Sequence, residues 1–104
     1  PSLLGVMPRD GSAAELRWFA GEACCVFHPL NAYDADGVIV ADMLRYDAGP
    51  GFPHADGRPP DPRQAEARLE RWRLDLGGAT DTFTTTRLDE QASEFPRLDE
   101  RFAG

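Results

Sequence analysis

Residues 23–46, ACCVFHPLNAYDADGVIVADMLRY, carry the strongest structural signal in the sequence. It begins with a largely apolar run, Ala23–Tyr33, and a second run, Val38–Tyr46, follows after a short polar interval. That interval, Asp34-Ala35-Asp36-Gly37, has the composition of a tight turn, in which glycine adopts a positive φ without steric cost. The stretch therefore predicts an antiparallel hairpin that pairs the strand carrying His28 with the strand that follows the turn.

Shorter segments of the same kind flank this hairpin. Most of them alternate apolar and polar residues and are bounded by Gly, Pro or Asp, as β-strands are. Residues 64–71 also suit a helix, but the alternation from Leu69 favours a strand. Residues 48–62 hold five prolines and three glycines and predict a surface loop. The expected strands outside the hairpin are Leu3–Met7, Leu16–Ala20, Leu69–Leu76 and Thr82–Arg87.

The even spacing of these strands is typical of an antiparallel meander, which forms a barrel, a sandwich or the blades of a propeller. A meander of about six strands standing alone would leave its edges unpaired, whereas neighbouring propeller blades would cover them. We therefore favour part of a propeller, with Trp18 and Trp72 as core aromatics. The chain opens at Pro1 and stops at Gly104 without a tail-like composition, so we expect an internal segment of a longer protein.

The composition excludes some classes of partner. The net charge is -7 and the isoelectric point is about 4.6. No cluster of basic residues interrupts this acidic balance, so a nucleic acid is not expected as a partner. All eleven basic residues are arginines, which is typical of a GC-rich bacterial genome.

The cysteines and the hydropathy indicate the compartment. Cys24 and Cys25 are adjacent in an apolar run, which favours buried free thiols on opposite faces of a strand and a reducing, cytoplasmic location. No apolar run approaches the roughly 18 residues of a membrane span. Membrane association of a longer parent protein is left open.

Two histidines stand in the chain, and His28 is the candidate for a site. A lone histidine at the end of an apolar strand is either a hydrogen-bonded core residue or a metal ligand, and no further ligand stands at local metal-binding spacing. His54 lies in the Pro/Gly-rich loop, where we expect an exposed imidazole. A triad of His28, Asp34 and His54 has the right residue types for iron, but nothing in their spacing supports it.

Several motifs resemble, in the same order, those of the carotenoid cleavage oxygenase family, which includes bacterial apocarotenoid-cleaving and stilbene-cleaving enzymes. The resemblance spans nearly the whole chain, and its weight lies in the order of motifs that are weak singly. The motifs are Gly5-Val6-Met7-Pro8-Arg9, Arg17-Trp18-Phe19, Phe27-His28, Asn31-Ala32-Tyr33-Asp34, Val40-Ala41-Asp42, Arg45-Tyr46, Leu69–Leu76 and Glu94-Phe95-Pro96-Arg97. Asp34 departs from the family pattern, which usually has glutamate there.

The resemblance implies a seven-bladed β-propeller whose axis holds Fe(II) on four histidines, three of them oriented by glutamates. His28 matches one metal-ligand position and Glu94 matches one of these glutamates, and the other ligands lie outside this chain. The expected fold class is all-β, with residues 1–104 forming one partial propeller domain of about two antiparallel blades and no separate domains within it. Neutral imidazole suits ferrous iron, and its other ring nitrogen requires an acceptor such as Glu94.

The function implied by the resemblance is cleavage of a carbon–carbon double bond of a carotenoid, apocarotenoid or stilbene into two carbonyl products. Dioxygen and an apolar conjugated small molecule would be the partners, and this segment alone would be inactive. Two other functions stay under consideration. One is a non-catalytic propeller that binds a partner, with His28 as a buried structural residue. The other is an isomerase or hydrolase reaction at the same iron. The sequence specifies neither the substrate nor the oligomeric state.

Overall fold

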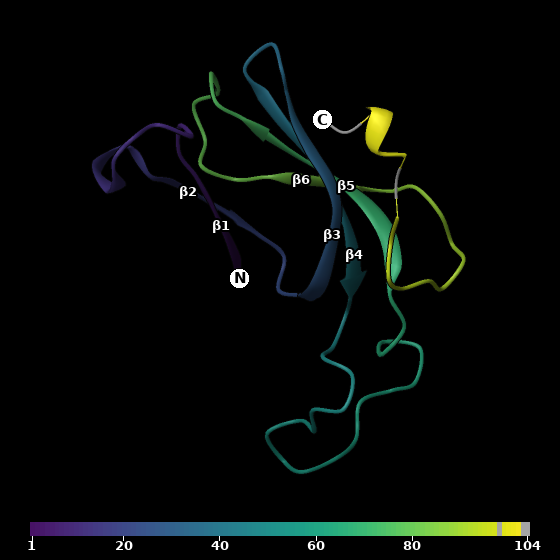
Figure 1. The fold of residues 1–104 in the computed structure, drawn as a ribbon. Coiled ribbons are helices and arrows are strands. Elements are labelled where there is room, and N and C mark those ends of the chain that lie inside the picture. Colours follow the sequence, from purple (N-terminus) through teal and green to yellow (C-terminus); the bar gives the residue numbers. More distant parts are fainter. Residues whose placement is uncertain (98, 103–104) are drawn as a thin grey trace.

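The computed structural model describes residues 1–97 and 99–102, and these residues form an almost entirely β structure (Figure 1). Each expected strand is present, with its ends shifted by two residues at most. None of the described helices has the length and apolar character needed to cross a membrane. The elements in chain order are β1 (Ser2–Val6), η1 (Ala13–Glu15), β2 (Arg17–Gly21), β3 (Cys25–Ala35), β4 (Val38–Tyr46), β5 (Arg68–Asp75), β6 (Thr84–Arg87) and η2 (Glu100–Phe102).

The strands form two antiparallel sheets. β1 pairs with β2, from Ser2 opposite Gly21 to Val6 opposite Arg17. β3, β4, β5 and β6 pair in sequence order as a four-stranded meander, which is the unit that a β-propeller repeats as its blade. The β1–β2 hairpin lies beside this meander (Figure 1). The antiparallel all-β fold expected from the sequence is confirmed.

The turn between β3 and β4 has the geometry that its residues predicted. Asp36 and Gly37 have positive φ angles of 52° and 81°, as the two central residues of a type I′ hairpin turn require. The Asp34 Oδ1 atom accepts a hydrogen bond from the Gly37 N–H at 3.1 Å. Ala35 pairs with Val38 directly across the turn, so the turn fixes the register at this end of the hairpin.

The main core lies between the two sheets. Phe19 of β2 and Leu74 of β5 have no exposed surface, and they pack in one cluster with Trp72 and Phe83. The rings of Trp72 and Phe83 are stacked with their centroids 4.7 Å apart. Trp72 is therefore a core aromatic, as expected.

Trp18 is not a core residue, and that prediction is wrong. Its side chain is 55% exposed, because Phe19 rather than Trp18 occupies the core face of β2, and neighbouring strand residues point to opposite faces. Trp18 lies opposite Gly5 of β1, and the space that a side chain at Gly5 would fill is taken by the indole and by Leu16.

A second, smaller core contains Leu44 and Tyr46, at the end of β4, and Ala67, just before β5. The two cysteines face different clusters, Cys24 the main core and Cys25 this smaller one. Both thiols are free and half-buried. The opposite orientation expected for them is confirmed, whereas full burial is not.

Arg17 connects the two sheets. Its guanidinium lies 4.6 Å from the centroid of the Phe19 ring. It donates hydrogen bonds to the backbone oxygen of Leu76 at 2.6 Å and to Asp81 Oδ1 at 2.7 Å. The Ala20 N–H also donates to the Asp81 backbone oxygen at 2.8 Å. These contacts hold the β1–β2 hairpin against the segment that leads into β6.

A Gly21→Ala substitution is expected to lower the free energy of unfolding by about 1–3 kcal/mol, as overpacking of a core typically does. A Cβ atom at Gly21 would lie 2.1 Å from the Phe83 ring, and this ring cannot withdraw because it is buried against Trp72. Urea denaturation of the full-length protein measures the effect. The matched control is Gly77→Ala, whose Cβ would meet no atom closer than 3.6 Å. Equal destabilisation by both substitutions would contradict this account.

The connection between β4 and β5 extends away from both sheets (Figure 1). It contains the Pro/Gly-rich residues 48–62, which are predominantly exposed, so the expected surface loop is confirmed. His54 is exposed in this loop, and its N–H donates to the Arg58 backbone oxygen at 2.8 Å. The loop therefore carries the second histidine away from the meander.

Candidate metal centre

His28 lies at an irregularity in β3. Val26 pairs with Arg45 and Pro29 pairs with Met43, so three steps along β3 are matched by two steps along β4. Such an extra residue is a β-bulge, which leaves one residue outside the ladder and redirects its side chain. Pro29 has no N–H to contribute to the ladder, which suits the irregular position. The bulge leaves the His28 side chain 42% exposed, so the imidazole is accessible to a ligand.

Glu94 reaches His28 from the segment that follows β6. The Ser93 N–H donates to the Ala67 backbone oxygen at 2.9 Å, which brings this segment back beside β5. The Glu94 Oε1 atom is 2.9 Å from His28 Nδ1 and accepts the Phe95 N–H at 3.1 Å. The other oxygen, Oε2, accepts a hydrogen bond from the Tyr46 hydroxyl. The structure thus brings the two candidate residues, His28 and Glu94, into direct contact.

The contact with Glu94 determines the tautomer of His28. A carboxylate is only an acceptor, so His28 Nδ1 carries the proton and donates it to Glu94 Oε1. The neutral ring then keeps its lone pair on Nε2, the form in which histidine binds a metal. Among the described residues, neither a hydrogen bond nor an ion pair reaches Nε2. The donor set therefore fits one imidazole ligand of a metal ion.

The electrostatics of the pair favour an ionised carboxylate. Burial acts to raise the pKa of Glu94, but the hydrogen bonds from Tyr46 and His28 outweigh it, and the pKa lies below its ordinary value. Burial, followed by the hydrogen bond to Glu94, raises the pKa of Tyr46 to about 12. Tyr46 is consequently a neutral phenol at physiological pH, and it can only donate to the Glu94 carboxylate.

Phe95 completes the immediate surroundings of the imidazole. Its ring centroid lies 5.0 Å from that of His28, and the side chain is 77% exposed. Its φ angle is 55°, a left-handed conformation that is unusual for a bulky residue and is often found at functional sites. Phe27 precedes His28, is 48% exposed and packs edge-on against Tyr46. One aromatic ring, Phe95, therefore contacts the imidazole, and a second, Phe27, precedes it on β3.

Tyr46 is a member of the site that sequence reasoning missed. The sequence placed it only as the last residue of the returning strand. Register supplies a signal that could have found it. Counting outward from the pair Ala35–Val38, an unbroken ladder would put Tyr46 opposite Phe27, the neighbour of His28. The bulges move the actual partner to Cys25, which still leaves Tyr46 close to the histidine.

The other residues of the rejected iron triad do not join the site. Asp34 lies at the turn, where its carboxylate binds the Gly37 N–H, and His54 lies in the exposed loop. Among the described residues, no group of three or more His, Cys, Asp or Glu side chains is arranged to hold a metal ion. Residues 1–97 and 99–102 therefore do not form a complete metal site by themselves.

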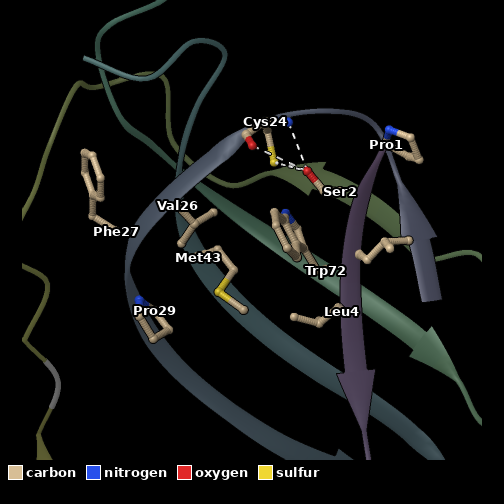
Figure 2. A pocket seen from close by; sticks show the side chains of 10 residues that line it. Pro1, Ser2, Leu4, Cys24, Val26, Phe27, Pro29, Met43 and Trp72 are labelled. Atoms are coloured by element: carbon tan, nitrogen blue, oxygen red, sulfur yellow. Dashed lines mark hydrogen bonds between the residues drawn. The ribbon is translucent and has the colours of Figure 1, made fainter. Parts of the chain in front are cut away.

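An apolar cavity of about 490 Å³ lies between β1 and the meander (Figure 2). Val26, Met43 and Trp72 line it on the meander side and Leu4 on the β1 side, while Ser2 and Cys24 are hydrogen-bonded to each other at one end. His28 is not among its lining residues. Phe27 and Pro29, the chain neighbours of His28, do line it, so the cavity lies beside the histidine site without including the imidazole.

The chain is thus an antiparallel all-β segment in which a carboxylate orients one histidine. The family model of the retinal pigment epithelial membrane protein matches residues 1–104. The chain therefore belongs to that family, which is the carotenoid cleavage oxygenase family that its motifs resemble. This membership also confirms the expected propeller fold, because the chain is similar in structure to a lignostilbene dioxygenase, which belongs to a β-propeller family.

Several individual relatives are named as oxygenases. The chain is 39% identical to isoeugenol monooxygenase of Pseudomonas putida over 103 residues, which are 98% of this chain and 22% of that protein. It is 39% identical to a carotenoid cleavage oxygenase of Mycobacterium tuberculosis over 112 residues, covering 100% of this chain and 20% of that protein. The chain spans about a fifth of the length of the curated relatives it matches.

A solved structure shows the same fold. The lignostilbene dioxygenase of Pseudomonas brassicacearum superposes with a TM-score of 0.87 at 39% sequence identity, covering 98% of this chain and 22% of that chain. The segment is thus similar in both sequence and structure to one part of a lignostilbene dioxygenase.

Proposed function

We propose that this chain is part of a non-haem Fe(II) dioxygenase that cleaves a carbon–carbon double bond of a conjugated substrate into two carbonyl products. His28 would supply one of the iron ligands through Nε2, and Glu94 would hold the ring. The observation that carries the proposal is the 2.9 Å contact between His28 Nδ1 and Glu94 Oε1, in a chain whose relatives are named as oxygenases. A segment with one ligand would be inactive alone.

The residues of the site would serve the iron in two ways. Glu94 keeps the proton on Nδ1, so the lone pair of His28 stays on Nε2 and faces away from the carboxylate. The negative charge of Glu94 would also offset part of the charge of a cation held by neutral ligands. Ferrous iron, when bound, supplies the chemistry that activates dioxygen. No protein nucleophile is required for this reaction class.

The proposed substrate is an apolar conjugated molecule, a stilbene, carotenoid or apocarotenoid. Two observations support this class. The relatives are named for isoeugenol, carotenoid and lignostilbene, and the side chains next to His28 that are most exposed, Phe27 and Phe95, are aromatic. We also propose a cytoplasmic location, which the free thiols of Cys24 and Cys25 support.

The experiment that tests the proposal uses the full-length protein that carries these residues. It is purified anaerobically, its iron content is measured, and it is then incubated with ¹⁸O₂ and a stilbene or an apocarotenoid. We expect near-stoichiometric iron and two carbonyl products, each carrying label from ¹⁸O₂. Iron with an isomerised or hydrolysed product instead would replace the oxygenase by the isomerase or hydrolase. Absence of iron after ferrous reconstitution would overturn the proposal and leave a propeller that binds a partner.

A further inference from the structure

Tyr46 holds the oxygen of Glu94 that His28 does not use. Its hydroxyl donates to Glu94 Oε2, while His28 donates to Oε1. The side chains of His28 and Tyr46 come from the paired strands β3 and β4, whereas Glu94 comes from the distant segment after β6. We propose that Tyr46 is a positioning residue of the metal centre: it fixes the Glu94 carboxylate, which in turn fixes the His28 ring. This inference rests on the proposed function.

Glu94 requires such an anchor because its own backbone is not part of a sheet. It lies outside the described strands, between β6 and η2. The contacts of Oε1 with His28 and with the Phe95 N–H both fall on one oxygen, and a carboxylate held at one oxygen can still rotate about its last carbon–carbon bond. The Tyr46 hydroxyl supplies the contact at the second oxygen. Together the contacts define the plane of the carboxylate and hence the direction of the hydrogen bond to His28.

Tyr46 is suited to act as the anchor because its own position is rigid. It is 7% exposed and belongs to the smaller core with Leu44 and Ala67. The edge of its ring contacts Phe27, with the centroids 5.5 Å apart. It lies on β4, which pairs with a strand on each side. The phenol is therefore held by packing, and only its hydroxyl takes part in the polar site.

The chemical consequence concerns the affinity for ferrous iron. Partners that orient a metal-binding histidine typically contribute 10- to 100-fold to metal affinity. Tyr46 acts one step further away, through a single hydrogen bond, so a smaller factor of about 3- to 10-fold is expected. Removal of the hydroxyl would let the carboxylate turn and weaken its hold on the Nδ1 proton of His28, without removing any atom that would contact the metal.

The test compares Tyr46→Phe with the wild-type full-length protein. Phenylalanine keeps the ring that packs in the smaller core and removes only the hydroxyl. The dissociation constant of ferrous iron alone is measured anaerobically by competition with a chromogenic chelator, and we expect it to rise about 3- to 10-fold. The matched control is Tyr33→Phe, which removes the hydroxyl of the other tyrosine from β3, and it should leave the dissociation constant unchanged.

A double-mutant cycle separates positioning from packing. If Tyr46 acts through Glu94, then Tyr46→Phe should have no further effect on iron affinity in a Glu94→Ala background. Independent, additive losses would overturn the inference, as would an unchanged affinity in the single Tyr46→Phe variant. Failure of the wild-type protein to bind ferrous iron at all would overturn the proposed function and this inference with it. Normal binding by both wild type and Tyr46→Phe would overturn this inference alone.

Discussion

A His28→Ala variant of the full-length protein is expected to bind ferrous iron at least about 100-fold more weakly than wild type, because loss of a ligand should exceed the 10- to 100-fold cost of losing a residue that only orients one. Under the proposed function His28 Nε2 binds the iron, and the hydrogen bond between Nδ1 and Glu94 keeps its lone pair available. Cleavage of the double bond should fall with the iron content. Elemental analysis after anaerobic purification and an assay of the carbonyl products measure the two effects.

The matched control for this variant is His54→Ala. It removes the other imidazole of the chain from an exposed loop, so it should change neither the iron content nor the products. A His28→Ala protein that retained wild-type iron would show that the histidine is structural, although its contact with Glu94 would remain a feature of the fold. Loss of iron in both variants would point to a general instability of the metal-free protein.

The fold could be predicted where local chemistry decides it. The Asp36-Gly37 turn requires positive φ angles that few residues adopt, so its position followed from the residue types. The residue types did not show in the same way which face of β2 is buried. Trp18 and Phe19 are both large and apolar, and alternation alone cannot say which of two such neighbours is buried. The contacts of Trp18 with Gly5 of the paired strand β1 and of Phe19 with Trp72 and Leu74 of β5 decide it, and the alternation within β2 shows neither contact.

The site was less predictable than the fold, for a reason that lies in β3. His28 and Glu94 came from a resemblance, since 66 residues separate them and no local spacing relates them. Their meeting depends on the bulge next to Pro29, which redirects the His28 side chain, and on the return of the segment after β6. Bulges shift the register without a strong sequence signal. Counting the register from the turn could have placed Tyr46 near His28, but its contact with Glu94 depends on the path of the segment after β6.

Glu70→Leu is expected to destabilise the full-length protein by about 3–5 kcal/mol, the usual cost of removing one partner from a buried ionic network. Glu70 is 3% exposed, and its carboxylate accepts hydrogen bonds from Arg45, from Arg87 and from the Trp72 indole at 3.2–3.4 Å. Arg45 is also buried, at 8% exposed. Burial acts to lower the pKa of Arg45, but Glu70 and Glu22 outweigh it, so Arg45 stays charged and depends on this carboxylate.

The control for Glu70→Leu is Glu66→Leu, which breaks the more exposed ion pair with Arg68 at 2.8 Å. Exposed pairs contribute at most about 1 kcal/mol, so this variant should unfold at nearly the wild-type urea concentration.

A third variant distinguishes the loss of a favourable interaction from the cost of leaving a buried charge without a partner. Replacing both partners, Arg45→Met with Glu70→Leu, removes the uncompensated guanidinium and should recover part of the loss. A double variant less stable than Glu70→Leu would mean that Arg45 stabilises the fold mainly through Glu22 and Asp47, its other carboxylate partners.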